Sequence, residues 1–293
     1  MLRSPVEVGL AGAGPWAATM HGPVLAAGPQ TRLAAVWARR PEAAARLAAQ
    51  LGAYAAASFE ELLDRCEAVA FAVPPDVQAA LAPRAARAGK ALLLEKPLAL
   101  DLAGAREIAG AVAESGVVTQ LVLTKRYHRA TREFLAAAAS FETAGARARY
   151  LHGAFLAGGM ATGWRLTRGA LYDLGPHLLD LADTALGPIE RARAAGDRRR
   201  WIELTCLHAG GTVSQLSLSG AVGLPRSHAG IELYGPDGTL GLDFATIDHG
   251  ECWPVLRAEF AAAVRSGVPH VLDVRRGLYL QELLDRIDRA DPW

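Results

Sequence analysis

Residues 6–17 read Val-Glu-Val-Gly-Leu-Ala-Gly-Ala-Gly-Pro-Trp-Ala, an apolar run that leads directly into a glycine-rich turn. The apolar run predicts a buried strand over residues 6–11, and the Ala-rich stretch over residues 16–27 predicts a helix. The junction between them is a G-x-G-x-x-A turn in the strand–turn–helix context that a dinucleotide-binding site requires.

In such a turn each small residue has its own role. Gly12 permits the sharp turn, Gly14 lets the backbone approach a pyrophosphate, and Ala17 keeps the helix close to the strand. The N–H groups at the start of the helix face the phosphates. We therefore predict that Gly12, Gly14, Pro15 and Trp16 bind a dinucleotide; the alternative is a tight turn without a ligand.

Up to about residue 123, short apolar runs alternate with helix-like segments. This alternation is typical of a parallel sheet covered by helices on both faces, and it predicts an N-terminal Rossmann domain over residues 1–123. Further strands are expected at residues 33–37, 68–72, 91–94 and 117–123. Helices are expected between them at residues 41–51, 76–88 and 102–114.

After residue 123 the apolar residues alternate with polar ones, which predicts a C-terminal α+β domain over residues 124–293 with an open, mainly antiparallel sheet. Its strands are expected at residues 146–155, 201–207, 212–218, 231–234 and 239–244. After a first helix at residues 131–139, three more, at residues 176–185, 254–265 and 274–289, are expected to cover one face. The other face, with apolar residues such as Leu216 and Leu218, predicts a homodimer or homotetramer.

Composition excludes several classes of protein. The 293 residues hold 31 basic and 30 acidic side chains, so the net charge of +1 gives no electrostatic reason to bind nucleic acid or an anionic membrane. No apolar run approaches the roughly 18–20 residues of a membrane span. The 3 cysteines are widely spaced, which suits a reducing compartment and leads us to expect a cytoplasmic protein. His249, Glu251 and Cys252 lie close together, but without a second pair at zinc spacing we expect no metal.

The end of the second predicted strand bears on the choice of cofactor. An NAD enzyme commonly has a carboxylate there for the ribose 2′-hydroxyl, whereas this chain has Ala38, Arg39 and Arg40. Guanidinium groups bind phosphate bidentately and keep their charge. We predict that these residues bind NADP, with NAD as the alternative cofactor; the two arginines could instead be a solvated start of the next helix.

Two further strings indicate a family. Glu95-Lys96-Pro97 follows a predicted strand, and Asp173-Leu174-Gly175-Pro176-His177 opens a later helix. Together with the glycine turn they resemble the glucose–fructose oxidoreductase / inositol dehydrogenase / rhizopine catabolism (Gfo/Idh/MocA) family. The resemblance implies a Rossmann domain followed by an open-sheet domain. It also implies hydride transfer between a nicotinamide and a hydroxyl or carbonyl carbon, often of a sugar or cyclitol.

The resemblance also implies roles for particular residues. Lys96 corresponds to the catalytic lysine, and Asp173 and His177 to the other polar catalytic positions. Pro74, Glu95 and Lys96 join the residues expected to contact the cofactor, and the peptide bond before Pro97 is expected to be cis. The chain contains only 3 lysines, at positions 90, 96 and 125, so a lysine here is more often expected to have a chemical role than in a lysine-rich chain.

Hydride transfer needs a proton donor or acceptor and a cation beside the reacting oxygen. His177 fits the general acid/base because imidazole titrates near neutrality, and Lys96 can stabilise a developing alkoxide. Asp173 could instead be only the N-cap of its helix, Lys96 an ordinary loop lysine, and His177 a core histidine.

The substrate is expected to be a small, polyhydroxylated molecule. Trp164 and Arg165 are candidate contacts because they lie in the short segment before Asp173, and substrate identity depends on such loops. Gln78 stands where many members of the family have histidine, which puts one polar contact of the site in question. The competing function is a non-catalytic dinucleotide-binding sensor of the same fold.

Overall fold

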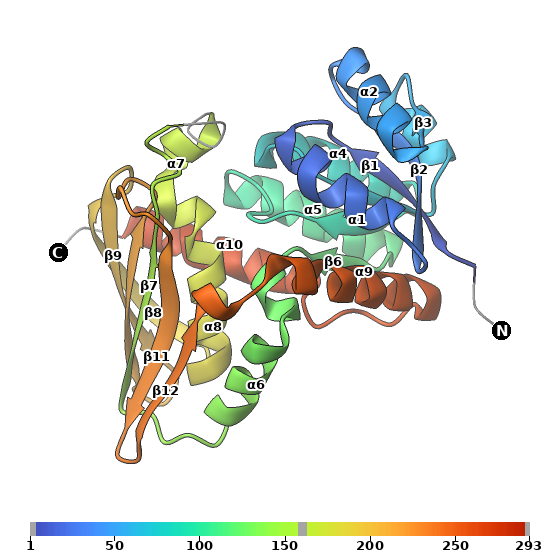
Figure 1. The fold of residues 1–293 in the computed structure, drawn as a ribbon. Helices are drawn as coiled ribbons and strands as arrows, with labels where there is room; N and C mark the ends of the chain where they lie inside the picture. The colour runs from blue at the N-terminus through green and yellow to red at the C-terminus, as the bar shows by residue number, and fades with distance from the viewer. Residues whose placement is uncertain (1–3, 158–162, 291–293) are drawn as a thin grey trace. The chain divides into compact units, whose positions relative to one another are not determined.

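The computed structural model describes residues 4–157 and 163–290. The chain forms two compact units (Figure 1). Unit 1 contains the chain up to Val122 together with Trp253–Leu278, and unit 2 contains Leu123–Cys252 and the chain from Tyr279 onward. This division corrects the prediction of two consecutive domains, because a segment more than 100 residues later in the chain belongs with the first unit.

Unit 1 is built on one parallel sheet with the strand order β3-β2-β1-β4-β5-β6. The central strands are buried on both faces, as a sheet covered by helices requires. The chain builds outward from β1 in one direction and then returns to build from β4 in the other, so β1 and β4 flank the switch point. The strands are β1 (Val6–Ala11), β2 (Thr31–Trp37), β3 (Tyr54–Ala55), β4 (Ala68–Phe71), β5 (Ala91–Leu94) and β6 (Thr119–Leu121).

The helices of unit 1 include α2 (Pro41–Leu51), α3 (Phe59–Asp64), α4 (Pro75–Arg87) and α5 (Leu102–Ser115). Helix α9 (His249–Ser266) also packs here from Trp253 onward, with Leu256 and Phe260 fully buried. The Gln120 amide donates to the Leu256 carbonyl at 3.0 Å, which ties this helix to the end of β6. The expectation that α9 covers the second sheet was therefore wrong: a helical period shows which face is buried but not which sheet buries it.

The helix predicted over residues 16–27 is not regular. A π-helical segment, η1 (Ala17–His21), precedes α1 (Gly22–Ala26), and the Gly22 N–H bonds to the Ala17 carbonyl five residues back. Pro23 follows and has no N–H to continue the α-helical ladder, which gives the physical reason for the wider turn. Such π segments occur preferentially at functional sites.

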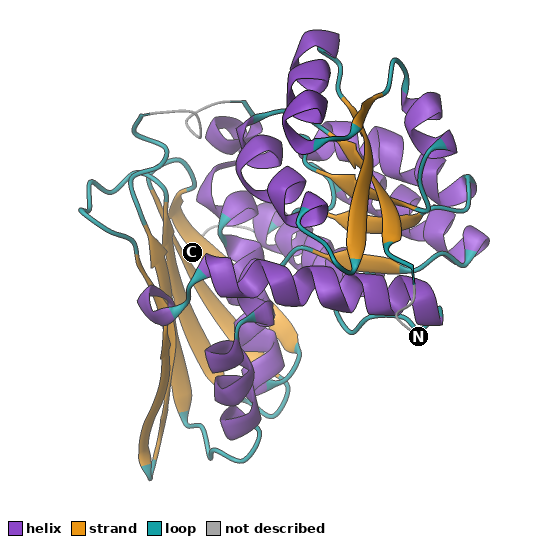
Figure 2. Cartoon of the chain, turned by 45° about the vertical axis from the view of Figure 1, so that its right-hand side comes forward, coloured by secondary structure: helices purple, strands orange, loops and turns teal. Residues whose placement is uncertain are grey.

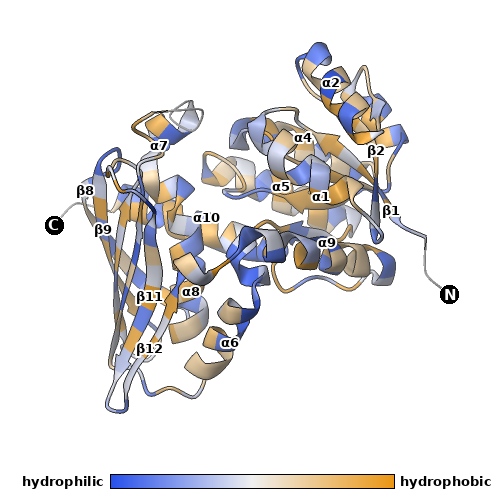
Figure 3. Cartoon of the chain, in the orientation of Figure 1, coloured by the Kyte–Doolittle hydropathy of each residue, from blue (hydrophilic) through white to orange (hydrophobic). Residues whose placement is uncertain are grey.

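Unit 2 contains a sheet with the order β12-β11-β7-β10-β9-β8, in which only β7 and β10 are parallel. The long helices of unit 2 lie on one of its faces (Figure 2). Orange and blue bands alternate along its strands in Figure 3, as expected for a sheet with one covered face. Its strands are β7 (Gly145–Leu151), β8 (Ile189–Asp197), β9 (Trp201–His208), β10 (Val213–Ser219), β11 (His228–Gly235) and β12 (Gly238–Asp243).

The face assigned to Leu216 and Leu218 was wrong. Both side chains are fully buried on the covered side, whereas Val213 is 42% exposed. Because side chains alternate along a strand, Val213, Gln215 and Ser217 share the open face instead. Strand β8 was not predicted, since its Arg- and Ala-rich sequence contains only one β-branched residue, Ile189.

The helices of unit 2 are α6 (Arg129–Ala138), α7 (Trp164–Asp173), α8 (Gly175–Leu186) and the part of α10 (Val274–Arg289) that begins at Tyr279. Two 3₁₀ turns, η2 (Thr124–Tyr127) and η3 (Phe244–Thr246), also belong to it. The segment expected as a loop around Trp164 is thus helical, with a break at Gly169, whose φ is +70°. None of the helices in the described ranges is long and apolar enough to span a membrane.

Candidate active site

In unit 1 the predicted cofactor residues follow four neighbouring strands. Gly12–Trp16 come after β1, Ala38–Arg40 after β2, Pro74 after β4 and Glu95 after β5. Because these strands are parallel, all four segments leave the sheet at its carboxyl edge, on both sides of the β1–β4 switch point. Open α/β sheets bind ligands at this position.

The geometry of the first turn fits a dinucleotide. Gly12 has φ +127°, and a Cβ there would lie 2.8 Å from the Ala72 carbonyl carbon and closer still to its oxygen, so only glycine can occupy the position. A Cβ on Gly14 would meet no atom within 4 Å, so the space above this backbone is open. No side chain caps the helix that begins after Trp16. Open space beside free N–H groups is what a pyrophosphate needs.

Arg39 and Arg40 lie at the end of β2, where both side chains are exposed. Arg40 is the N-cap residue of α2, and its side chain makes no capping hydrogen bond. Neither guanidinium forms an ion pair within the described ranges, so both are available to a phosphate.

The Glu95-Lys96-Pro97 turn contains the expected cis bond between Lys96 and Pro97. The Glu95 carboxylate is engaged by the protein itself: its Oε1 accepts from Trp16 Nε1 at 2.8 Å and lies 2.8 Å from His21 Nε2. A carboxylate only accepts, so Nε2 of the fully buried His21 carries the hydrogen, and its Nδ1 has no partner in the described chain. Glu95 thus joins the Lys96 turn to the glycine-rich turn.

In unit 2, Asp173 is the last residue of α7 and His177 lies in the first turn of α8. The prediction that Asp173 caps the later helix was wrong, because the N-cap position belongs to Leu174 and no side chain caps it. Asp173 is only 2% exposed and accepts a hydrogen bond from Arg165 Nε at 3.3 Å. The guanidinium of Arg165 also lies 4.7 Å from the Trp164 ring. The two predicted substrate residues therefore interact with each other, and Arg165 also binds Asp173.

A lysine–tyrosine pair beside His177 was not predicted as part of the site. Lys125 is buried and donates to the Tyr150 hydroxyl at 3.0 Å, and its Nζ lies 5.1 Å from the centre of the Phe244 ring. The rings of Tyr150 and His177 have their centres 6.0 Å apart. Within the described ranges Lys125 forms no ion pair with a carboxylate. The scarcity of lysine in the sequence was the signal that could have identified it.

The charge of Lys125 acts on two further groups in unit 2. Burial lowers the pKa of His249, and the nearby Lys125 lowers it further. Burial raises the pKa of Cys252 to about 11 although Lys125 opposes that change. Burial thus favours the uncharged forms of both groups, the imidazole of His249 and the thiol of Cys252. In the part of the chain that is described, no group of three or more His, Cys, Asp or Glu could hold a metal ion.

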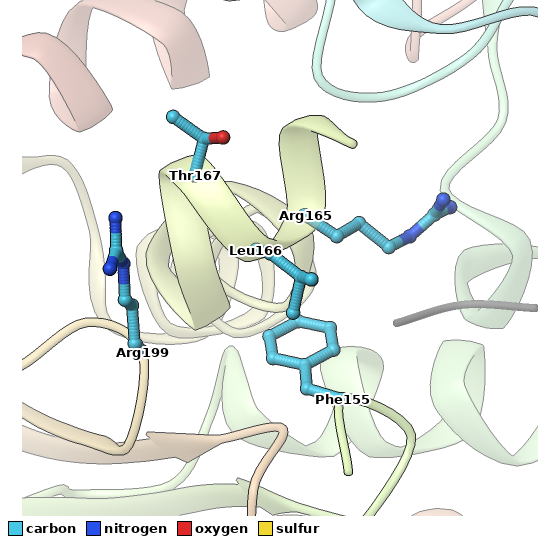
Figure 4. Close-up of a pocket in the computed structure, with 5 residues that line it drawn as sticks. All are labelled: Phe155, Arg165, Leu166, Thr167 and Arg199. Carbon is cyan, nitrogen blue, oxygen red and sulfur yellow. The ribbon is translucent and has the colours of Figure 1, made fainter. Parts of the chain in front are cut away.

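A pocket of about 320 Å³ lies beside α7 in unit 2. Figure 4 shows the Phe155 ring against Leu166, with Arg165 directed away from Thr167 and Arg199. The pocket includes one of the two predicted substrate residues, Arg165, but not Trp164. Lys96 belongs to unit 1 and His177 to unit 2, so their convergence beside one cofactor stays a prediction.

Comparison with known proteins gives two family matches. Residues 6–122 match a family described as "Oxidoreductase family, NAD-binding Rossmann fold". Residues 129–241 match the GFO/IDH/MocA C-terminal domain. Together these matches cover most of the chain. They include every strand of both sheets apart from the end of β12.

Individual relatives agree with the family matches. A dTDP-3,4-didehydro-2,6-dideoxy-alpha-D-glucose 3-reductase from Streptomyces violaceoruber is 30% identical over 87% of this chain and 77% of its own length. The crystal structure of GenD2 from gentamicin A biosynthesis in complex with NAD has a TM-score of 0.87 at 23% identity, covering 99% of this chain and 95% of that one. UDP-N-acetylglucosamine 3-dehydrogenase GnnA from Acidithiobacillus ferrooxidans has a TM-score of 0.82 at 24% identity, covering 96% of each chain.

Proposed function

Because the chain belongs to the Gfo/Idh/MocA oxidoreductase family, we propose that it is an NAD(P)-dependent enzyme that transfers a hydride between nicotinamide and a hydroxyl or carbonyl carbon of a sugar or cyclitol. The observation that carries the proposal is the carboxyl edge of the first sheet. There the glycine-rich turn with the open space at Gly14 follows β1, and the turn that bears Lys96 follows β5. The two strands lie on opposite sides of the switch point of one parallel sheet.

The side chains have separate tasks in this reaction. When bound, the nicotinamide supplies or accepts the hydride. Lys96 donates a hydrogen bond to the reacting oxygen and stabilises the charge that develops on it. His177 gives or takes the proton of that oxygen, and its neighbour Tyr150, held by Lys125, restricts the position of the ring. Asp173, held by Arg165, is available to a substrate hydroxyl.

The test is nicotinamide absorbance with a panel of free sugars, cyclitols and nucleotide-linked keto sugars; the last are included because two of the relatives are named for such compounds. With a substrate identified, Lys96→Met and His177→Ala should each lower kcat by about a hundredfold or more, and Asp173→Asn should also reduce it, at unchanged cofactor affinity. Lys90→Met and His228→Ala are matched controls and should keep full activity. Full activity in the Lys96 and His177 variants would remove these two assignments.

The competing function, a sensor that binds dinucleotide without turning over a substrate, makes a different prediction. Such a protein would bind NAD(P)H tightly and show no absorbance change with any member of the panel. The presence of Lys96, Asp173 and His177 in one chain favours the enzyme, since binding alone needs neither a proton donor nor a cation for a reacting oxygen.

NADP is our proposed cofactor, on the basis of Arg39 and Arg40. Their exposed, unpaired guanidiniums follow β2, where a 2′-phosphate would lie. Replacing both with alanine should weaken NADPH binding by about tenfold or more and leave NADH binding unchanged, because a hydrogen bond to a charged group contributes about 1.5–3 kcal/mol. Tighter binding of NADH than of NADPH by the unmodified protein would contradict the proposal.

We also propose that the protein assembles as a homodimer or homotetramer through the open face of the second sheet. That face carries Trp201, Val213 and Tyr234, each more than a third exposed. Light scattering should report a multiple of 30.9 kDa, and Val213→Glu should shift it toward the monomer. A monomer at working concentration would refute this assembly.

The three thiols are unpaired, which supports a reducing compartment such as the cytoplasm.

A further inference from the structure

A buried glutamine on α4 binds the turn that carries Lys96. Gln78 has no exposed surface, and its Nε2 donates to the carbonyl of Glu95 at 2.8 Å and to that of Leu98 at 3.0 Å. Its Oε1 accepts from the Glu95 N–H at 2.8 Å. Every hydrogen-bonding atom of the Gln78 side chain is thus directed at the backbone of residues 95–98.

Gln78 binds three backbone groups of this turn, and the Lys96 N–H donates to the Glu95 carboxylate at 3.3 Å. The turn begins where β5 ends, at Leu94, and Pro97 has no N–H to donate. Its polar groups at Glu95 and Leu98 would be left without partners in a buried environment if Gln78 were absent, and such groups are costly. The Lys96 side chain remains partly exposed while the peptide groups on both sides of it are held from inside.

Only a primary amide satisfies all three contacts. The amide offers two N–H donors and one acceptor, which matches two carbonyls and one N–H. A neutral imidazole offers one donor and one acceptor, and an ionised carboxylate offers no donor. Histidine or glutamate at this position would therefore leave at least one backbone group of the turn unpaired.

We propose that Gln78 is a positioning residue that sets the location of the Lys96 amino group for hydride transfer. The proposal rests on the proposed function and goes beyond it, because Gln78 acts through the turn and need not touch substrate or cofactor. Displacing a catalytic group by about 1 Å can lower a rate by about a hundredfold. The inference therefore predicts an effect on kcat rather than on cofactor binding.

The decisive variant is Gln78→Glu, which keeps the shape of the side chain. When ionised, glutamate loses both donors and places a negative charge against two carbonyl oxygens; when protonated, it regains one donor and one acceptor. We expect kcat to fall by about tenfold or more, with the Kd for NAD(P)H changed by less than about twofold. The ratio of variant to unmodified activity should rise as the pH is lowered, because protonation restores part of the contact set.

Gln120→Glu is the matched control. Gln120 is also a fully buried glutamine of unit 1 that donates to a backbone carbonyl, that of Leu256, but it does not touch the Lys96 turn. Both variants should lose stability, so activity is measured well below both unfolding midpoints. Only Gln78→Glu should show the pH-dependent loss of kcat. The same loss in Gln120→Glu would overturn the proposal, and so would a folded Gln78→Glu variant whose kcat equals that of the unmodified protein.

A second readout does not depend on turnover. The chain has only 3 lysines, so isotope-labelled dimethyl-lysine groups give few NMR signals to resolve. Gln78→Glu should move the Lys96 signal, and Gln120→Glu should leave it in place. If the unmodified protein turns over no substrate while the Lys96 signal moves as expected, the proposed function fails and the role of Gln78 in placing Lys96 stands. An unmoved Lys96 signal refutes that role.

Discussion

Adding one methyl group at Gly14 tests the cofactor site directly. A Cβ there meets no atom within 4 Å, and the backbone is not in the left-handed region, so Gly14→Ala should fold normally. It should even be more stable by about 0.4–1 kcal/mol, because alanine restricts the unfolded chain. The methyl group would lie in the open space that we assign to the pyrophosphate. We expect it to remove one or two hydrogen bonds to a charged group.

The size of the effect follows from those hydrogen bonds. Each contributes about 1.5–3 kcal/mol, and about 1.4 kcal/mol corresponds to tenfold in affinity. Gly14→Ala should therefore raise the Kd for NAD(P)H by about tenfold to a hundredfold or more. The measurement is a fluorescence titration with NADPH and NADH, alongside a urea unfolding curve of the free protein.

Two other glycines of unit 1 serve as controls. Gly110, in the exposed part of α5, also has open space around a Cβ, so Gly110→Ala should leave affinity unchanged. Gly12→Ala should instead destabilise the fold by about 2–5 kcal/mol, from its positive φ and the clash with Ala72. Unchanged cofactor affinity in folded Gly14→Ala would show that no phosphate approaches this backbone and would refute the site.

Three further predictions concern stability and reactivity. Burial lowers the pKa of His208, whose ring bonds to the Gly187 carbonyl and to Ser214, so the unfolded chain binds more protons than the folded one below about pH 6.5. Stability should therefore fall as the pH drops through that range. The urea midpoint of His208→Gln should depend less on pH than that of the unmodified protein, and an equal pH dependence would contradict this prediction. Asp180→Asn should lower the free energy of unfolding by about 3 kcal/mol or more, because Arg126 pairs with this fully buried carboxylate at 2.7 Å. A urea midpoint equal to that of the unmodified protein would exclude a structural role for the pair. Burial raises the pKa values of Cys66, Cys206 and Cys252 to about 11, 12 and 11. At pH 8 a thiol reagent should therefore hardly modify the native protein, whereas the unfolded protein should consume three equivalents. Rapid modification of the native protein would contradict the burial of the thiols.

Local patterns were sufficient for five of the six strands of the first sheet; the two-residue strand β3 was not predicted. Strand β1 has the bounds predicted for it, and the glycine turn and the Lys96 turn follow the strands as expected. Hydrophobic periodicity and glycine spacing act over a few residues, so they can be read without knowing what lies across the fold. The second sheet was also predicted as mainly antiparallel, although the missing strand β8 and the inverted face of Leu216 show the limit of the pattern.

Sequence alone pointed to Lys96, Asp173 and His177 as candidates, because their motifs are contiguous. Only the tertiary structure decided what holds them. Gln78 reaches the Lys96 turn from 17 residues away, Glu95 contacts Trp16 from 79 residues away, and Lys125 meets Tyr150 25 residues later. A hydrogen bond depends on the position of two atoms in space, and no periodicity along the chain encodes such a pairing. The candidate residues could therefore be chosen from the sequence, whereas the side chains that hold them in place could be found only from the fold.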